Sequence, residues 1–196
     1  MIEAAAAKVG KKTFVDDLKK VGTPRLEYQK TCSKVVTLEE AIRQSGLKDG
    51  MTISFHHHFR DGDYVANLVM KEVAELGIRD VTIAASSLGA AHDPIARYIE
   101  EGVVTGLQTS GIRGRMGEVV SQGRLRAPAI LRSHGGRVRA IEEGEVHIDV
   151  AFIGAPTSDE CGNARAVGGR SARGPGPARS APERERTFPT STYLSP

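Results

Sequence analysis

Residues 51–85 read MTISFHHHFRDGDYVANLVMKEVAELGIRDVTIAA, a succession of strand, helix and strand signals. A β-rich run at 51–55 follows an Asp49-Gly50 turn and predicts the first strand. The helix is predicted by apolar residues at helical spacing, with Asp63 as N-cap and Gly77 just past the end: Val65, Leu68, Val69, Val73 and Leu76. The run Val81–Ala85 is typical of a buried strand. The order predicts a βαβ unit with two parallel strands.

The same alternation extends in both directions from this unit. Upstream, Thr37 and Glu40 form a capping box that predicts a helix ending at Gly46. Downstream, Asp93-Pro94 predicts a helix start with Pro in the first helical position. Further strands are predicted at 103–107, 129–131 and 147–153, and further helical segments at 116–122 and 138–143. We therefore predict an α/β fold with a mainly parallel sheet and helices on both faces.

Composition bounds the class of protein. The 196 residues carry a formal net charge of +3 and are 39% hydrophobic, which suits one globular domain, alone or with an appendage. These values exclude a collagen-like or wholly disordered chain, and the weak charge gives no reason to expect a nucleic-acid partner. We find neither a signal peptide nor an apolar run of membrane-spanning length, so no membrane association is expected. Cys32 and Cys161 lack metal-ligand or CxxC spacing, so we expect free thiols and a cytoplasmic location.

The loops that leave the predicted strands carry the candidate site. In a parallel sheet these loops meet at the carboxyl edge, where ligands bind, and here they combine Gly with hydroxyl, His and Arg side chains. One shared site is therefore expected. Its candidate residues for binding substrate or thioester are His56, His57, His58, Arg60, Gly62, Ser110, Gly111, Arg113, Gly114, Ser133, His134, Gly135, Gly136, Arg137, Gly162 and Asn163.

The triple histidine at 56–58 has three interpretations. In an extended segment His56 and His58 share a face and His57 points away. Zinc needs three or four ligands, and no Cys, Asp or Glu stands at a supporting spacing, so no metal is expected. The histidines either cap and pack a loop or make polar contacts with an anionic substrate or a thioester carbonyl.

The glycine-rich loops at 110–114 and 134–137 offer backbone N–H groups to an anion or a developing oxyanion, unless the glycines serve only tight turns. Each loop adds an arginine, whose fork suits a carboxylate or phosphate. The nucleotide-binding fingerprints GxGxxG and the P-loop are absent. A Ser/His/Asp hydrolase lacks its GxSxG elbow, and Cys161 is interpreted as a buried or incidental thiol. No nucleophile is assigned.

Four segments together resemble a known family: residues 49–63 (DGMTISFHHHFRDGD), 109–114 (TSGIRG), 133–137 (SHGGR) and 148–152 (IDVAF). They resemble the alpha subunits of bacterial citrate lyase, the citrate CoA-transferases, and the likeness runs in order through residues 31–172. The resemblance implies the first half of a CoA-transferase-like α/β fold, which agrees with the βαβ pattern.

The resemblance also implies a reaction and partners. In that family an acetyl thioester on the CoA-like arm of an acyl carrier protein, the gamma subunit, exchanges its acyl group with citrate. Citryl carrier and acetate result, and a beta subunit then splits the citryl thioester to oxaloacetate and acetyl carrier. The transfer passes through an anhydride without an acyl-enzyme. No covalently bound cofactor is expected, acetyl-CoA can stand in for the acetyl carrier, and Arg60, Arg113 or Arg137 could pair with citrate.

The sequence departs from the family after Ala172, where Arg173 replaces a Cys. Residues 171–196 hold five of the nine Pro, and no Val, Ile or Met follows Val167, so no strand is expected there. We expect an N-terminal extension at 1–36, the α/β domain at 37–172, and a disordered tail at 173–196, hypothesised to be an out-of-frame translation.

Three alternatives to an active transferase remain open. One is a truncated, inactive fragment that carries one wall of the site. Another is a ligand-sensing module of the same fold, although 1–33 shows no clear DNA-binding helix pair. The third is a relative of the sugar-phosphate isomerases.

Overall fold

The computed structural model describes residues 35–56, 64–154, 157–158, 164–165 and 186–188, all of which belong to the unit Thr31–Pro196. Its elements, in chain order, are α2 Leu38–Ser45, β1 Thr52–His56, α3 Val65–Glu75, β2 Val81–Ala85, the 3-10 helix η2 Ala90–Ile95, α4 Ala96–Glu100, β3 Val104–Thr109, α5 Gly114–Ser121, β4 Ile130–Leu131, α6 His134–Glu142, β5 Val150–Ile153, β6 Thr157–Ser158, β7 Ala164–Arg165 and β8 Arg186–Phe188. No helix among the described residues is both long and apolar enough to span a bilayer.

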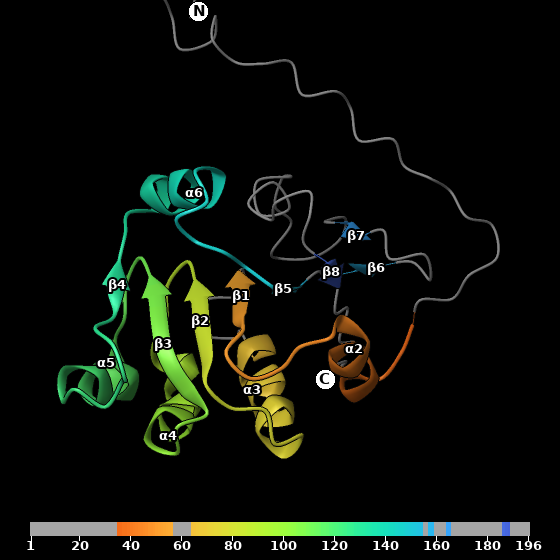
Figure 1. Cartoon of the computed structure of the whole chain (residues 1–196), viewed down its shortest axis with the longest axis horizontal. Helices are drawn as coiled ribbons and strands as arrows, with labels where there is room; N and C mark the ends of the chain where they lie inside the picture. The colour runs from red at the N-terminus through yellow and green to blue at the C-terminus, as the bar shows by residue number, and fades with distance from the viewer. Residues whose placement is uncertain (1–34, 57–63, 155–156, 159–163, 166–185, 189–196) are drawn as a thin grey trace, which may run out of the picture. The chain divides into compact units, whose positions relative to one another are not determined.

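A parallel sheet organises these elements. Its strand order is β4-β3-β2-β1-β5-β8, and every neighbouring pair runs parallel (Figure 1). β6 and β7 form a separate antiparallel pair. The predicted fold class, an α/β fold with a mainly parallel sheet, is thereby confirmed, and β1 to β5 match the five predicted strands to within three residues at each end.

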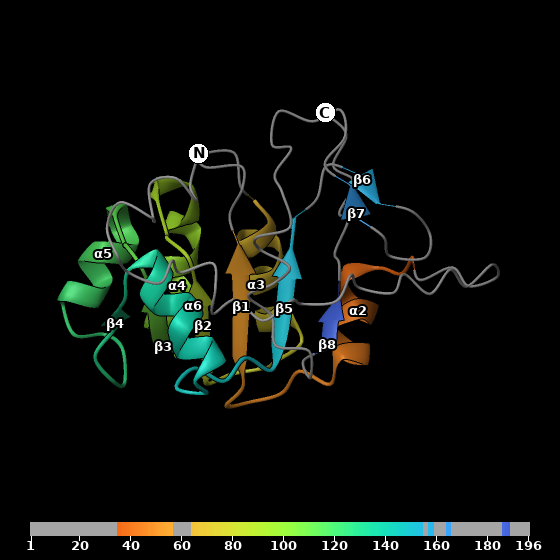
Figure 2. The same cartoon turned by 90° about the horizontal axis from the view of Figure 1, so that it is seen from above.

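Helices cover both faces of the sheet, as predicted. On one face, α3, α4 and α5 pack on alternate strand residues such as Ile53, Ile83 and Leu107, each at most 2% exposed. On the other face α6 is the only one of the described helices that packs, through Ala140 and Ile141, in a smaller cluster that includes Ala84 and Ala151 (Figure 2). Each fully buried Ile contributes about 1.5–3 kcal/mol, so the larger cluster supplies most of the stabilisation.

The start of α2 follows the local sequence signals. Thr37 is the N-cap, and its hydroxyl oxygen accepts from the N–H of Glu40 at 3.2 Å, as the capping box predicts. Gly46 ends the helix in the left-handed conformation with φ 73°.

Two predicted helix starts are wrong. α3 begins after Tyr64 rather than Asp63, and Tyr64 makes no side-chain cap hydrogen bond. Asp93 and Pro94 lie inside η2 because the helical turn already begins at Gly89, whose C=O accepts from His92 N–H at 2.9 Å. Asp93 instead places its carboxylate against Gly114, at the start of α5. A negative charge there is favoured by the helix dipole.

The helix predicted at 138–143 is wrong in extent, and the expectation that residues 171–196 hold no strand is wrong. α6 begins at His134, four residues before the predicted helical turns, because Ser133 caps it. β8 comes from the segment where no strand was expected, and it pairs with β5 at the edge of the sheet. Backbone N–H and C=O groups alone make that pairing, so it does not require β-branched residues.

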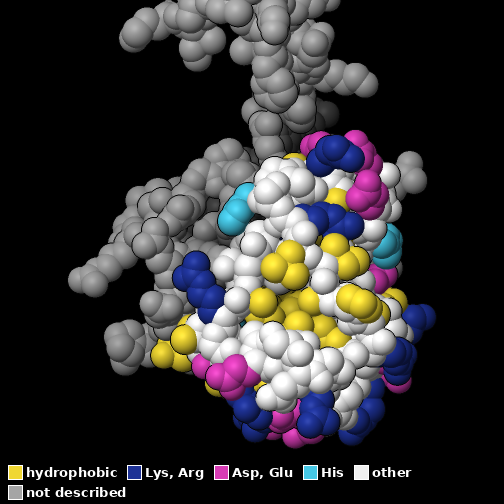
Figure 3. Space-filling view, turned by 90° about the vertical axis from the view of Figure 1, so that its left-hand side faces the viewer, with side chains coloured by type: hydrophobic (Ala, Val, Ile, Leu, Met, Phe, Trp, Pro, Cys, Tyr) yellow, Lys and Arg dark blue, Asp and Glu magenta, His cyan; other side chains and the backbone are white. Residues whose placement is uncertain are grey.

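At the opposite edge of the sheet, β4 exposes two aliphatic side chains. Ile130 is 44% exposed and Leu131 is 58% exposed, and Val138 of α6 is 40% exposed. Figure 3 shows apolar side chains gathered in the middle of this side of the molecule, with charged side chains toward its rim.

The close approach of Asp93 to α5 gives a stability test. Gly114 has φ 63°, and an added Cβ would lie 2.5 Å from Asp93 Oδ1, whereas Gly123 has φ 73° and open space around it. Gly123→Ala should therefore lower the free energy of unfolding by about 1 kcal/mol through backbone strain alone. Gly114→Ala should cost at least about 1 kcal/mol more, because Asp93 must also move. Urea unfolding of both variants measures the difference, and equal losses would show that the contact with Asp93 is unimportant.

Candidate functional site

The strand order reverses direction at β1. β2, β3 and β4 follow on one side of β1, and β5 lies on the other, with His56 and Ile153 as register partners at their carboxyl ends. Open α/β sheets bind ligands at such a switch point, just beyond the carboxyl ends of the strands. The segments that leave β1 and β5 start side by side there, and they contain the triple histidine and the Gly162-Asn163 pair. His57, His58, Arg60, Gly62, Gly162 and Asn163, and the side chain of His56, lie outside the described residues.

The segment after β3 is tied to the segment after β2. Ser110 N–H donates to the C=O of Ser86 at 3.0 Å, Leu88 N–H donates to the C=O of Gly111 at 2.8 Å, and Arg113 N–H donates to the C=O of Leu88 at 3.0 Å. The predicted convergence of these two loops at one edge is therefore seen in the backbone. The Ser110 hydroxyl oxygen is buried and has no hydrogen-bond partner among the described residues.

Arg113 stands at the start of α5. It is the N-cap residue, with extended backbone, and its side chain is exposed. Within the described part of the chain no carboxylate lies within ion-pair distance of it, whereas Arg115, two residues on, pairs with Glu100 at 2.9 Å. Arg113 is thus a cation at the carboxyl edge of the sheet that no carboxylate of the described residues neutralises.

The SHGGR segment forms the first turn of α6. The Ser133 hydroxyl oxygen accepts from the N–H of Gly136 at 3.0 Å, and the N–H of Arg137 donates to the C=O of Ser133 at 2.8 Å. His134 and Gly135 are exposed at the beginning of the helix. The interpretation of these residues as a loop is corrected: they form a capped helix N-terminus, and the Gly136 N–H is already used by Ser133.

Arg137 lies in α6 on the side that faces the sheet, and only 8% of its surface is exposed. Its Nη2 donates to the Ser54 hydroxyl oxygen at 2.8 Å and to the C=O of Ala84 at 3.3 Å. Its Nε is buried and has no hydrogen-bond partner among the described residues. Burial lowers the pKa of the Arg137 guanidinium, because a charged group loses hydration there.

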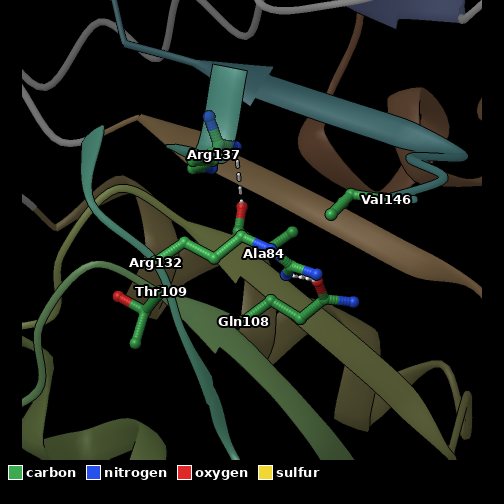
Figure 4. A pocket seen from close by; sticks show the side chains of 6 residues that line it. All are labelled: Ala84, Gln108, Thr109, Arg132, Arg137 and Val146. Atoms are coloured by element: carbon green, nitrogen blue, oxygen red, sulfur yellow. Dashed lines mark hydrogen bonds between the residues drawn. The ribbon is translucent and has the colours of Figure 1, made fainter. Parts of the chain in front are cut away.

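Arg137 borders a small pocket of about 10 Å³ between α6 and the sheet, which is also lined by Ala84, Gln108, Thr109, Arg132 and Val146. Figure 4 shows the bond from Arg137 to the Ala84 carbonyl and, beside it, the Arg132 side chain that reaches Gln108. Arg132 Nη1 donates to Gln108 Oε1 at 2.8 Å, and its Nη2 lies 3.5 Å from a carboxylate oxygen of Glu145.

Sequence reasoning did not select Arg132, Gln108, Thr109 or Ser54. The sequence held one indication. Ser54 carries a hydroxyl group between the apolar residues Ile53 and Phe55, and a buried polar group needs a hydrogen-bond partner. Nothing in the sequence showed that the partner would be Arg137, which lies 83 positions away along the chain.

Comparison of the sequence with known proteins points to one family. The family model described as "Citrate lyase, alpha subunit (CitF)" matches residues 30–180. The citrate lyase alpha chain of Haemophilus influenzae is 53% identical over 135 residues, which cover 69% of this chain and 27% of that protein. That of Escherichia coli is 47% identical over 159 residues, which cover 78% of this chain and 31% of that protein.

A solved structure shares the fold. The crystal structure of an alpha subunit of citrate lyase from Streptococcus mutans, in complex with citrate, superposes with a TM-score of 0.75 at 42% identity. The match covers 85% of this chain and 34% of that one. The chain thus spans about a third of the length of the relatives it matches. Because the family model covers most of the chain and the fold agrees, this chain belongs to the citrate lyase alpha subunit family.

Proposed function

We propose that the chain takes part in the acyl exchange between an acetyl thioester and citrate, as the citrate CoA-transferase component of a citrate lyase complex. The observation that carries the proposal is the switch point between β1 and β5, because open α/β sheets bind ligands beyond the carboxyl ends of the strands at such a point. The related alpha subunit from Streptococcus mutans, whose structure is a complex with citrate, supports the choice of substrate.

The proposed reaction proceeds in two transfers. A citrate carboxylate oxygen attacks the acetyl carbonyl carbon of the thioester, the new C–O bond forms, and the C–S bond breaks to give an anhydride and a thiolate. The thiolate then attacks the citryl carbonyl carbon, a C–S bond forms, and acetate leaves. Both transfers develop an oxyanion, which backbone N–H groups and arginines stabilise. No side chain of the protein needs to act as nucleophile.

The proposed partners follow from the same reaction. The acetyl group arrives on the CoA-like arm of an acyl carrier protein, the gamma subunit, and acetyl-CoA can replace that carrier. The beta subunit cleaves the citryl thioester. Membership of the citrate lyase alpha subunit family supports both partners. The histidines at 56–58 enter the proposal by their place in the sequence at the end of β1, and the Gly162-Asn163 pair by its place between β6 and β7.

The activity itself is the first test. Incubation of the chain with citrate and acetyl-CoA should release acetate and form citryl-CoA in equal amounts, because each exchange yields one of each. Chromatography of the acyl-CoA species and an enzymatic acetate assay measure the two products. Acetate release that does not depend on citrate would indicate thioester hydrolysis and would count against the proposal, as would no release at all.

Arg113 gives a test of how citrate is held. Its exposed guanidinium at the carboxyl edge suits a citrate carboxylate, and a charge-assisted hydrogen bond contributes about 1.5–3 kcal/mol. Arg113→Gln should therefore raise the Kd for citrate at least about tenfold, with little change in stability because the side chain is exposed. Isothermal titration with citrate measures this.

The matched control is Arg115→Gln, which removes the same charge from the same helix but breaks a surface pair with Glu100. It should change the Kd for citrate less than about twofold. Equal weakening by both variants would mean that only the overall charge matters and that Arg113 does not contact citrate.

A further inference from the structure

His92 is a buried histidine that the proposed reaction does not use. It lies in η2, which follows the loop after β2, and only 1% of its surface is exposed. Its backbone N–H donates to the C=O of Gly89 at 2.9 Å, and its ring Nδ1 accepts from the N–H of Gly89 at 3.2 Å. His92 and Gly89 are therefore bonded in both directions, as in a capping box, where the second side chain is usually Glu or Gln.

The bond to Gly89 determines which nitrogen of the His92 ring carries the proton. A backbone N–H can only donate, so Nδ1 is the acceptor and carries no proton. The ring is therefore the neutral tautomer with its proton on Nε2. A neutral ring suits a side chain that is almost completely buried, because burial penalises a charge.

Gly89 follows Leu88, which holds the segment after β3. Leu88 N–H donates to the C=O of Gly111 at 2.8 Å, and its C=O accepts from the N–H of Arg113 at 3.0 Å. Leu88 is itself only 1% exposed. A short series of hydrogen bonds thus leads from the His92 ring to the backbone of Arg113, the N-cap of α5.

η2 is held by the helices on either side of it. Asn67 of α3 donates through Nδ2 to the C=O of Ala91 at 2.7 Å. The Asp93 carboxylate lies against Gly114, the first residue of α5. His92 stands between Ala91 and Asp93 in the sequence, so its ring connects a fixed element to the loop after β2.

We propose that His92 is a positioning residue, whose bond to Gly89 holds Leu88 and thereby fixes the backbone of Arg113 at the carboxyl edge of the sheet. This inference rests on the proposed function for the ligand, citrate, and for the role of Arg113. An arginine on a fixed backbone loses less conformational entropy on binding an anion than one on a mobile loop. Loss of the bond to Gly89 should therefore weaken the binding of citrate.

Two substitutions of His92 test the inference. His92→Leu removes the acceptor and keeps a bulky side chain, whereas His92→Asn keeps an acceptor, because Asn Oδ1 takes the place of Nδ1. Isothermal titration should show the Kd for citrate raised about threefold to tenfold in His92→Leu and less than about twofold in His92→Asn. Equal weakening in the two variants, or none in His92→Leu, would overturn the inference.

A control variant separates positioning from a general loss of stability. Ile42→Val removes one buried methylene from α2, which lies beside β8 at the far edge of the sheet (Figure 1). It should lower the Tm and leave the Kd for citrate unchanged, because α2 is remote from η2. A rise in Kd as large as that in His92→Leu would show that destabilisation alone weakens binding and would overturn the inference.

Amide hydrogen exchange tests the same inference without citrate. In His92→Leu the N–H groups of Leu88 and Arg113 should exchange at least about fivefold faster than in the wild type, because a buried N–H without an acceptor favours local opening. In His92→Asn they should keep their wild-type rates. Unchanged exchange in His92→Leu would overturn the inference. Faster exchange in a chain that does not bind citrate would leave the positioning of Arg113 standing while the proposed function failed.

A measurement on the wild-type chain does not depend on how the variants fold. In a ¹⁵N-labelled chain, nuclear magnetic resonance should detect a scalar coupling between the Gly89 amide nitrogen and His92 Nδ1, because a hydrogen bond transmits it. The His92 ring should carry a proton on Nε2 and none on Nδ1. A proton on Nδ1 would overturn the inference, since Nδ1 could then not accept from Gly89.

Discussion

The pairing of β1 on both of its edges is the constraint on which the rest of the structure depends. β1 bonds to β2 on one side and to β5 on the other, both parallel, so the chain must cross the sheet on opposite faces to build the two halves. Because strand residues alternate, Ile53 and Phe55 enter the large core, while Ser54 faces α6. One short strand thus positions both the hydrophobic core and the acceptor for Arg137.

Elements with strong local signals were predictable from the sequence. α2 has its capping box, β2 is a buried apolar run whose predicted ends match, and α3 shows helical spacing over its whole length. The errors occur where tertiary contacts or the backbone decide. Asp93 looks like a cap for its own helix, but it lies against the start of α5 instead. β8 joins the sheet through backbone pairing, which composition does not reveal.

The candidate site was predictable in outline and not in detail. Parallel topology alone requires that the segments after β1, β2, β3 and β5 meet at one edge, and the bonds between the Ser86–Leu88 and Ser110–Arg113 segments show two of them meeting. The burial of Arg137 depends on which face of the sheet α6 covers. The crossover from β4 to β5 determines which face α6 covers. The sequence of α6 does not predict this face, because only Arg137, Ala140 and Ile141 of its nine residues are buried.

A purely structural role for Arg137 explains its hydrogen bonds but not its charge. A tether between α6 and β1 needs a donor for Ser54 and for the Ala84 carbonyl, and a neutral amide would supply one without the cost of desolvating a cation. The tether also leaves Nε without a partner among the described residues, which adds a further cost. Arg137 therefore holds α6 against β1 through two neutral acceptors, and no carboxylate of the described residues balances its charge.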